Sequence, residues 1–526
     1  MAAAEENNVR DAPARAVKKL EAAIGKENVK TSKMERLLYS HEGSAPLPNI
    51  AQLGFMNVPD IVVRPTSTAD VQKIVQIANE EGIPIVPRGA STWGMGGSMP
   101  IFGGIIVDMM GKMNRIVEID VDNLCCTAEA GASYKSVYDA CLAKGLLLGS
   151  YPSSFPNASI GGWLAKDGVG IGSYKYGGPV NNLRNIEVVM PDGSVCETGF
   201  KYVVDNSAGY NLSSLQIGAE GTLGIICKVT LKLQPFGGTL KNVAYSFGRL
   251  QEIGKPLWDL CRSQVVPLHI GFSDGRHFDF LRKAGKHVPE VGTILNIAFE
   301  GSKENVERDE AAVDAIMAKH GGKKMTPEVG QHEWDERCYE YRAREVGIDS
   351  VPGEVVVPLK DFETMTNRCY ELIDALKMDG AIIGIMCDRN TVMFMPYYFL
   401  DSNSFLQMTS FAFSKKVGDI AMEYGGRGLG FGALFSSNLE VIRGKDNARQ
   451  MKAMKMALDK NETMNPGKLL EMQTRYGIGI SPKLFGMAMD GMLVAKKALP
   501  RTNEFDKKAE DYEEERKKKG TGGHQH

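Results

Sequence analysis

Several features that mark other classes of protein are missing from this chain of 526 residues. Its nine cysteines include no CxxC or CxxxC pair, so neither an iron–sulfur cluster nor a structural zinc module is predicted. No apolar run approaches the ~18 residues of a membrane-spanning helix, and the N-terminus lacks the apolar core of a signal peptide. With 62 basic and 64 acidic residues, the chain has no basic surplus for nucleic acid. We expect a cytoplasmic protein with reduced thiols and no nucleic-acid partner; membrane association through a partner stays open.

The length of the chain predicts more than one domain, since single cores stop growing near ~250–300 residues. Its 43% hydrophobic and 24% charged residues are typical of a globular protein. Strand-like and helical patterns alternate along it, which predicts an α+β fold. We expect a helical extension (1–45), a cofactor-binding domain (46–235), a cap domain for the substrate (236–425), a segment that returns to the first domain (426–475), an amphipathic helix (476–502) and a disordered charged tail (503–526).

Small residues follow the predicted strand that ends near Pro87. The segment reads Pro87-Arg-Gly-Ala-Ser-Thr-Trp-Gly-Met-Gly-Gly-Ser98. Small residues after a strand let successive backbone N–H groups converge, and such a concavity binds a diphosphate. Taken alone, a glycine-rich stretch of this kind is more often a simple turn.

Two further segments are equally rich in glycine. The clusters Ser159–Gly162, Gly168–Gly172 and Lys175–Gly178 follow one another closely, and Gly218-Ala-Glu-Gly-Thr-Leu-Gly224 opens onto an apolar strand. Interior glycine weakens a core strand, whereas a flat, extended ligand close to the backbone explains such clusters. The three segments together therefore predict a site for one elongated nucleotide.

These motifs resemble those of the flavoprotein superfamily of vanillyl-alcohol oxidase and p-cresol methylhydroxylase (PCMH), in the branch of glycolate oxidase and the D-lactate dehydrogenases. The first loop of that branch typically reads PRGGGTGLSGG and here PRGASTWGMGG; the third reads GSEGTLGIIT and here GAEGTLGIIC. A fourth motif, NPGKL, stands at Asn465–Leu469. The resemblance implies an α+β protein with a two-lobed PCMH-type FAD-binding domain and an α+β cap like the C-terminal domain of FAD-linked oxidases.

FAD is the cofactor that this resemblance implies. Residues 88–91 would wrap its diphosphate, residues 159–162 would line the ribityl and isoalloxazine side, and Ile225 would contact the adenine through its backbone. Lys468 would close the flavin site from the C-terminal segment. The full expected set is Pro87, Arg88, Gly89, Ala90, Ser91, Thr92, Gly97, Pro152, Ser159, Ile160, Gly161, Gly162, Gly168, Gly221, Ile225 and Lys468.

The chain departs from the family at its metal site. Glycolate and lactate members carry G-H-x-G-D-G-N-x-H, whose two histidines bind a divalent metal. The corresponding stretch here runs from Gly384 to Val392, and both histidine positions are apolar, Ile385 and Val392. Neither side chain can ligate a metal, so no metal is predicted.

A 2-hydroxy acid needs a cation for its carboxylate and a base for its hydroxyl proton. Arg344 lies in a stretch that resembles the W-x-x-R segment of the family, and Arg427, with Tyr424 nearby, falls where phenol-oxidising relatives carry a Tyr-Arg pair. We predict Arg344, Arg427, Tyr424 and His332 as the catalytic residues. The alternatives are Arg342 and Arg389 for the cation, and His269, Tyr397 and Tyr398 for the base.

The predicted function is an FAD-dependent dehydrogenase that oxidises the CH–OH group of a small hydroxy acid, such as lactate or glycolate, by hydride transfer to flavin N5. Its electrons would pass to a quinone or to a partner, an iron–sulfur protein or an electron-transfer flavoprotein. Two alternatives are an enzyme like vanillyl-alcohol oxidase, acting on a phenolic or other alcohol, and a flavin electron-transfer subunit of a larger redox complex. A Met-rich stripe at residues 484–493 suits a helix that docks such a partner. The exact substrate, covalent attachment of the flavin and a homo-oligomeric state stay open.

Overall fold

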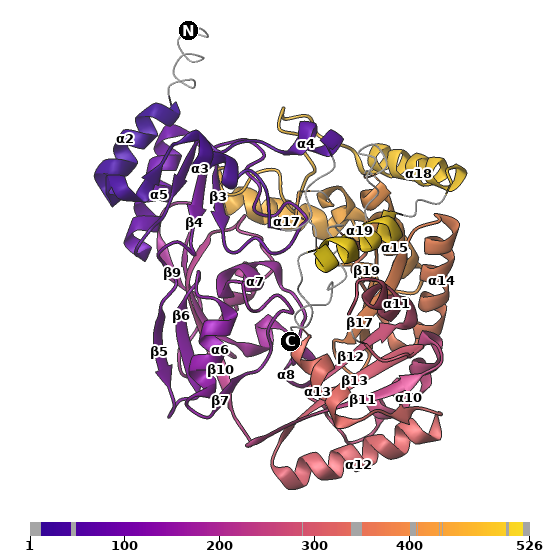
Figure 1. Ribbon diagram of the computed structural model, residues 1–526. Helices are drawn as coiled ribbons and strands as arrows, with labels where there is room; N and C mark the ends of the chain where they lie inside the picture. Colours follow the sequence, from indigo (N-terminus) through magenta and orange to yellow (C-terminus); the bar gives the residue numbers. More distant parts are fainter. Residues whose placement is uncertain are drawn as a thin grey trace. The chain divides into compact units, whose positions relative to one another are not determined.

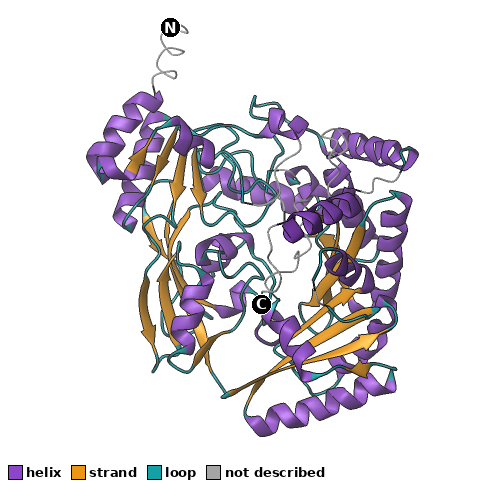
Figure 2. Cartoon of the chain, viewed as in Figure 1, coloured by secondary structure: helices purple, strands orange, loops and turns teal. Residues whose placement is uncertain are grey.

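We describe the protein from a computed structural model. It describes residues 12–43, 49–286, 288–337, 350–399, 407, 409–430, 432–433, 435–500 and 504–518. The chain divides into two compact units. The first comprises Met1–Val169, Gly177–Pro235 and Gly430–Phe485, and the second comprises Gly170–Tyr176, Phe236–Leu429 and Gly486–His526. Both units mix helices with strands (Figure 2), which confirms the predicted α+β class.

The first unit begins with a four-stranded sheet. Its order is β1 (Val29–Lys30), β2 (Ile61–Val63), β4 (Ile105–Asp108), β3 (Ile85–Arg88). Strands β2 and β3 run parallel to β4, and the core between them is Val62, Val86 and Ile106. Helix α5 (Thr68–Glu81) joins β2 to β3: the Ser67 side chain caps its start and Gly82, at φ +63°, ends it. Strand β3 therefore delivers the chain into the first glycine-rich segment.

A second, antiparallel sheet of the first unit has the order β5 (Ile116–Asp120), β6 (Cys125–Glu129), β10 (Ile225–Pro235), β8 (Leu183–Val189), β9 (Val195–Glu197), and β7 (Leu146–Leu148) also pairs with β10. The hairpin between β8 and β9 turns at Gly193, whose φ is +83°. The helices of this unit are α2 (Ala12–Ile24), η1 (Lys26–Asn28), α3 (Lys33–Leu38), α4 (Asn49–Phe55), α5, α6 (Tyr134–Leu142), α7 (Ile160–Lys166), η2 (Pro179–Asn182), α9 (Ser213–Gln216), η7 (Ser436–Asn438), α16 (Leu439–Arg443) and α17 (Lys445–Leu458).

The C-terminal part of the first unit returns to its first sheet. After α17, the N–H of Ile85 donates to the Thr463 carbonyl at 2.7 Å, and the N–H of Asn465 donates to the Ile85 carbonyl at 2.7 Å. Residues 463–465 thus extend the sheet beside β3, at the strand that leads into the first glycine-rich segment. A segment nearly 400 positions later in the sequence is thereby placed next to that loop.

The second unit is built on one antiparallel sheet. Its order is β14 (Lys323–Lys324), β11 (Thr239–Phe247), β13 (Thr293–Gly301), β12 (His269–Asp274), β17 (Gly380–Met386), β18 (Thr391–Phe399), β16 (Val355–Pro358), β19 (Arg427–Gly428), and β15 (Ser350–Pro352) also pairs with β18. Its helices are α8 (Ser173–Tyr176), η3 (Leu250–Ile253), α10 (Gly254–Arg262), α11 (Gly275–Lys283), α12 (Lys303–Lys319), α13 (Pro327–Asp335), η5 (Leu359–Asp361), α14 (Phe362–Ala375), α15 (Thr409–Glu423) and α19 (Glu504–Lys518).

Helices cover both faces of this sheet. Figure 1 shows α12 and α14 along one side, where Phe362 of α14 packs against Phe272 and Phe394 of the sheet. The opposite face carries α13, whose Trp334 lies against His269 of β12 at 6.4 Å between ring centroids. The central strands β17 and β18 are buried along nearly their whole length, and they read as nearly continuous apolar runs.

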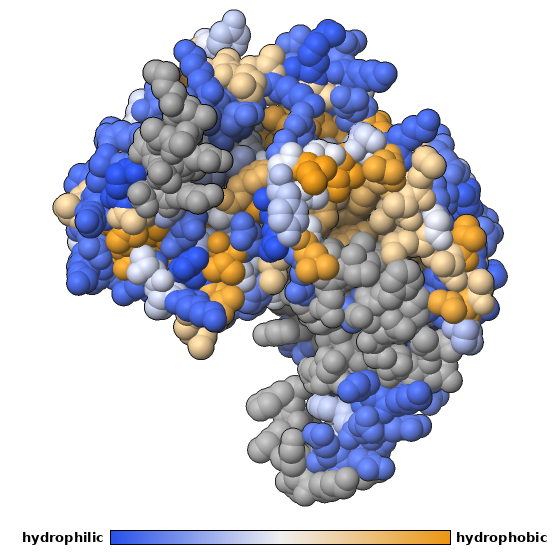
Figure 3. All heavy atoms as spheres, turned by 90° about the horizontal axis from the view of Figure 1, so that it is seen from above, coloured by the Kyte–Doolittle hydropathy of each residue, from blue (hydrophilic) through white to orange (hydrophobic). Residues whose placement is uncertain are grey.

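Helix α18 (Pro482–Ala498) begins in the first unit and continues into the second. Of the Met-rich stripe, Phe485, Met489 and Leu493 are buried, whereas Met487 is 64% exposed. Apolar residues lie among hydrophilic ones on the face drawn in Figure 3. Among the described residues, no helix combines the length and apolar character needed to cross a membrane.

The charged C-terminus differs from its prediction. Residues 504–518 form helix α19, whereas the sequence predicts disorder from 503 onward. Phe505 is fully buried and its ring lies 4.4 Å from that of Phe399 and 4.9 Å from that of Phe280. One aromatic anchor on an amphipathic helix therefore outweighs the polar composition that predicts disorder.

Candidate functional site

Three glycine-rich loops and the C-terminal segment meet within the first unit. We call them loop 1 (residues 89–98), loop 2 (residues 152–168), loop 3 (residues 218–224) and the closing segment (residues 459–469). Loop 1 follows β3 and is held at its far end by Glu42: one carboxylate oxygen accepts from the N–H of Gly96 at 2.8 Å, and the other from the N–H of Ser98 at 2.9 Å. Burial raises the pKa of Glu42. This contact fixes the shape of loop 1 before any ligand binds.

The first half of loop 1 keeps its backbone donors available. Among the described residues, the N–H groups of residues 90–95 donate to no carbonyl and no side chain. Ser91 within this stretch has a φ of +56°. A run of unpaired amides on a turn is an anion-binding arrangement, so loop 1 fits a diphosphate.

Glycine is required where the loops touch. A Cβ on Gly89 would lie 2.1 Å from the Ser159 hydroxyl oxygen, so loop 1 packs directly on loop 2. A Cβ on Gly221, whose φ is +71°, would lie 2.4 Å from Cγ of Pro87, so loop 3 packs directly on the end of β3, next to loop 1. No other residue allows these approaches without moving one loop away from another.

Loop 2 carries the start of helix α7. The Ser159 hydroxyl accepts from the N–H of Gly162 and caps this helix, while the N–H groups of Ile160 and Gly161 already donate to the carbonyls of Ala132 and Ala130. Those two amides are therefore engaged within the protein. Loop 2 therefore contributes the capped N-terminus of α7, which lies beside Gly89.

The remaining loop 2 residues lie around that terminus. The Pro152 carbonyl accepts from the N–H of Phe155 at 3.0 Å, and Thr92 of loop 1 lies 3.3 Å from the Ser154 hydroxyl. Gly168 packs on the indole of Trp163, because a Cβ there would lie 2.5 Å from Nε1.

The closing segment joins loops 1 and 3. The Asn465 side-chain amide donates to the Gly97 carbonyl at 2.9 Å and to the Glu220 carbonyl at 2.7 Å. Lys468 donates to the Met99 carbonyl at 2.6 Å and is only 3% exposed. Burial lowers the pKa of Lys468 to about 7, against the opposing influence of the Glu42 and Glu220 carboxylates.

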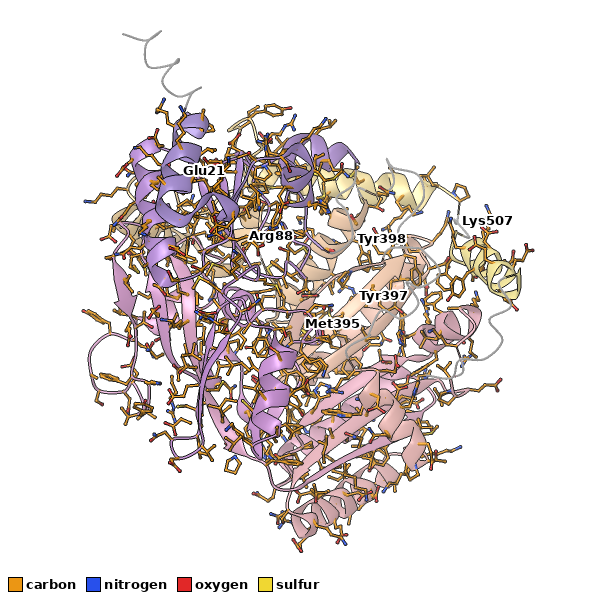
Figure 4. The ribbon with its side chains drawn as sticks, turned by 60° about the vertical axis from the view of Figure 1, so that its left-hand side comes forward. Glu21, Arg88, Met395, Tyr397, Tyr398 and Lys507 are labelled. Atoms are coloured by element: carbon orange, nitrogen blue, oxygen red, sulfur yellow. The ribbon has the colours of Figure 1, made fainter. Side chains whose placement is uncertain are left out.

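The structure thus gathers most of the expected cofactor residues in one place. Loops 1, 2 and 3 and Lys468 are connected by the contacts above, and Ile225 begins β10 directly after loop 3, paired with Val189. Arg88, labelled in Figure 4, directs its guanidinium to the His41 carbonyl at 2.8 Å and faces the Tyr39 ring at 5.2 Å. Its side chain supports the N-terminal segment, so its expected contact with a diphosphate stays a prediction.

Sequence reasoning missed Glu42, Glu220 and Asn465. Two of them stand inside the motifs themselves: Glu220 lies in loop 3, and Asn465 begins the NPGKL stretch. Glu42 gives no local signal, because its partners lie 54 and 56 positions away in the sequence.

Of the expected catalytic residues, Tyr424, Arg427 and His332 lie in the described part of the second unit, on or next to different elements. The Tyr424 hydroxyl accepts from Arg368 of α14 at 3.0 Å. Arg427 is exposed on β19, opposite Val356 of β16, and His332 is partly buried on α13. Arg344, together with Arg342, falls outside the described residues.

Two of the alternative candidates have partners within the protein. Arg389 donates to the carbonyls of Cys261 at 2.7 Å and Ser263 at 2.8 Å, which ties it to the end of α10. Tyr397, which precedes Tyr398 on β18 (Figure 4), lies 2.8 Å from Nδ1 of His277. The hydrogen bonds of both side chains within the protein explain their presence without a catalytic role.

His269, another alternative for the base, is 3% exposed, and no hydrogen bond to its Nδ1 is found among the described residues. Burial, and to a lesser extent the charge of Arg337, lowers the pKa of His269 to about 3. Its imidazole is therefore neutral at physiological pH.

The two apolar positions that replace metal-binding histidines are both buried: Ile385 is on β17 and Val392 on β18. Over the part of the chain that is described, no group of three or more His, Cys, Asp or Glu side chains is placed to hold a metal ion.

Comparison with known families covers both units. Residues 59–199 match the FAD binding domain family, and residues 240–469 match the family of FAD linked oxidases, C-terminal domain. Glycolate oxidase subunit GlcD of Bacillus subtilis (strain 168) is 28% identical over 466 residues, which are 86% of this chain and 96% of that protein. The D-lactate dehydrogenase of Anaerostipes hadrus is 27% identical over 438 residues, which are 78% of this chain and 89% of that protein.

Solved structures share the fold. The structure of p-cresol methylhydroxylase with substrate bound is similar with a TM-score of 0.74, at 20% identity, covering 87% of this chain and 96% of that one. Alkyldihydroxyacetonephosphate synthase is similar with a TM-score of 0.70, also at 20% identity, covering 86% and 84%. The two family matches, together with the open amides of loop 1 and the glycine contacts around it, show that the chain joins an FAD binding domain to the C-terminal domain of FAD linked oxidases and is a flavoprotein oxidoreductase whose cofactor is FAD.

Proposed function

We propose that this flavoprotein oxidises a small 2-hydroxy acid, such as lactate or glycolate, to the corresponding 2-oxo acid. The observation that carries the proposal is the match to a glycolate oxidase subunit over 96% of that protein's length, which includes the domain that follows the FAD-binding one. Bound FAD supplies a two-electron acceptor for the hydride of the substrate C–H bond. The proposed electron acceptor is a partner protein or a quinone.

The cap would have to supply a cation and a proton acceptor from its own side chains. Ile385 and Val392 cannot ligate a metal, so arginine is the remaining partner for the substrate carboxylate, which its planar fork matches. We assign this role to Arg344 and Arg427, and the removal of the hydroxyl proton to His332 or Tyr424.

Anaerobic titration of the holoenzyme tests the proposal. The purified protein, treated with a chelator, is mixed with D- and L-lactate, glycolate, p-cresol or vanillyl alcohol, and loss of the oxidised flavin absorbance is followed. We expect bleaching by one of the hydroxy acids and none by the two phenolic compounds. Bleaching by a phenol alone would transfer the chain to the phenol-oxidising group, and reduction by a redox protein but by no small molecule would make it an electron-transfer subunit; either result overturns the proposal.

A further inference from the structure

We infer that Lys455 of α17 and Asp459, which follows the helix directly, act as positioning residues. Together they form a clamp that sets how far the closing segment stands from loop 3 and thereby the affinity for FAD. Neither residue belongs to the glycine-rich motifs or to NPGKL. The inference rests on the assignment of loops 1 and 3 to FAD and does not depend on the substrate.

Lys455 connects two stretches of backbone that are distant in sequence. Its ammonium donates to the Thr222 carbonyl in loop 3 at 2.8 Å and to the Met464 carbonyl in the closing segment at 2.7 Å. Its third partner is the Asp459 carboxylate, one helical turn later. All three donors of the ammonium are therefore used, and two of them span the gap between loop 3 and the closing segment.

Asp459, the first residue of the closing segment, holds the turn that follows it. One carboxylate oxygen accepts from the N–H of Thr463 at 3.1 Å and from its hydroxyl at 3.2 Å, and the other accepts from the N–H of Met464 at 2.9 Å. The Thr463 hydroxyl also lies 3.0 Å from the Asn79 side chain at the end of α5. The turn after α17 is thus fixed by one carboxylate.

The clamped residues border Asn465, which contacts loop 1. Thr463 and Asn465 exchange backbone hydrogen bonds with Ile85 of β3, the strand that leads into loop 1. Asn465 then donates to carbonyls of loops 1 and 3. A change in the length or angle of the clamp therefore shifts loop 3, which carries Gly221, relative to loop 1.

Burial argues against a role in helix stability alone. Lys455 is 7% exposed and Asp459 is 2% exposed. A buried ion pair is often no more stabilising than apolar residues of the same size, and its best-attested use is to specify one arrangement. The same helix offers a matched contrast: Lys452, one turn earlier, forms an exposed ion pair with Glu471 at 2.9 Å.

The test separates positioning from stability. Two quantities are measured: the FAD dissociation constant, from flavin fluorescence, and the melting temperature of the FAD-free protein. The variants are Lys455→Met, Asp459→Asn and the double variant, with Lys452→Met as control. We expect roughly tenfold weaker FAD binding or more in Lys455→Met, with a lower melting temperature because the buried carboxylate of Asp459 loses its counter-ion. In the double variant the melting temperature recovers, while FAD binding stays weak. Lys452→Met changes neither.

Two results overturn the inference. If the double variant regains FAD affinity together with its melting temperature, the pair serves stability only. If Lys455→Met binds FAD as tightly as the parent protein, the spacing of loop 3 is set elsewhere. A third measurement, the FAD affinity of Gly221→Ala, checks the assignment of loop 3 itself: a normal affinity there would remove the basis of the inference, whatever the outcome for the substrate.

Discussion

The two units of the protein use different parts of the chain for binding. In the first unit the expected ligand contacts are main-chain amides, exposed because the residues around them have little or no side chain. In the second unit the expected contacts are side chains spread over several elements. A site made from backbone leaves glycines in consecutive positions, which a single sequence displays. A site made from side chains on separate elements leaves no such run.

Four arginines illustrate the second case. By sequence alone, Arg427 is a predicted partner of the substrate carboxylate and Arg389 is an alternative. In the structure Arg389 holds two carbonyls at the end of α10, whereas Arg427 is exposed on an edge strand. Arg276 and Arg368 form ion pairs with Asp374 and Glu423. The guanidinium group is the same in all four, so only tertiary contacts distinguish their roles.

The sharpest test of the backbone-built site is Gly221→Ala. The new Cβ costs ~1–2 kcal/mol at the left-handed φ, and overpacking against Pro87 adds ~1–3 kcal/mol. We expect FAD binding to weaken by roughly a hundredfold or more, since 1.4 kcal/mol is a factor of ten. Equilibrium titration of the FAD-free protein with FAD measures this.

Gly145→Ala is the matched control for that substitution. Gly145 has a φ of +73°, close to that of Gly221, but a Cβ there meets nothing within 4 Å. It should lose about 1–2 kcal/mol of stability from the backbone alone and keep its FAD affinity. Equal losses of affinity in both variants would show that global destabilisation, and not the contact between loop 3 and Pro87, controls FAD binding.

Lys468 introduces one charged side chain into the backbone-built site. Its pKa is about 7 when folded and ~10.4 in an unfolded chain. Between these values the unfolded chain binds a proton that the folded protein lacks, so the unfolding free energy rises with pH. The slope approaches ~1.4 kcal/mol per pH unit, or roughly 2–3 kcal/mol from pH 7 to 9. Below pH 7 both states are protonated and the cost of burying the charge is present in full.

Chemical denaturation of FAD-free protein at several pH values measures this contribution as the difference between the parent and Lys468→Met. The variant lacks the titrating amine, so its stability should rise less between pH 7 and 9. Parallel pH profiles for the two proteins would contradict the burial of a neutral amine and would place Lys468 in contact with solvent.

Much of the first unit follows from the sequence. The unit β2–α5–β3, the hairpin at Gly193 and the NPGKL segment each have a local cause: an N-cap, a glycine in a left-handed turn, a proline next to a glycine. The supports of the loops do not follow, because Glu42 and Lys455 act over long sequence distances. Their residue types are common on helix surfaces, so nothing in the sequence separates Lys455 from Lys452.

The structure of the second unit is harder to predict from the sequence for the same reason. Its strands are visible as apolar runs, but the register that places Arg427 opposite Val356 depends on pairing between residues about 70 positions apart. For the C-terminal helix, the composition predicts disorder, whereas the residues form a helix whose Phe505 packs against Phe399. Composition describes averages, and one buried ring is enough to change the outcome.

Arg427→Met tests whether the side-chain-built site includes this arginine. If its guanidinium binds the substrate carboxylate, the variant loses a charge-assisted hydrogen bond, and KM for the hydroxy acid rises roughly 10–100-fold. The FAD dissociation constant should stay unchanged, because the cofactor contacts belong to the first unit. Steady-state kinetics with an artificial electron acceptor and flavin fluorescence give the two quantities.

Arg276→Met is the control, since Arg276 forms an exposed ion pair with Asp374 at 2.7 Å in the same unit. A surface pair of this kind contributes ~0–1 kcal/mol, so KM should change less than about twofold. A normal KM in Arg427→Met would leave Arg344 as the expected carboxylate partner. A loss of FAD affinity in Arg427→Met would contradict the assignment of cofactor binding to the first unit. A side chain of the second unit would then contribute to a site that we assign to the backbone of the first unit.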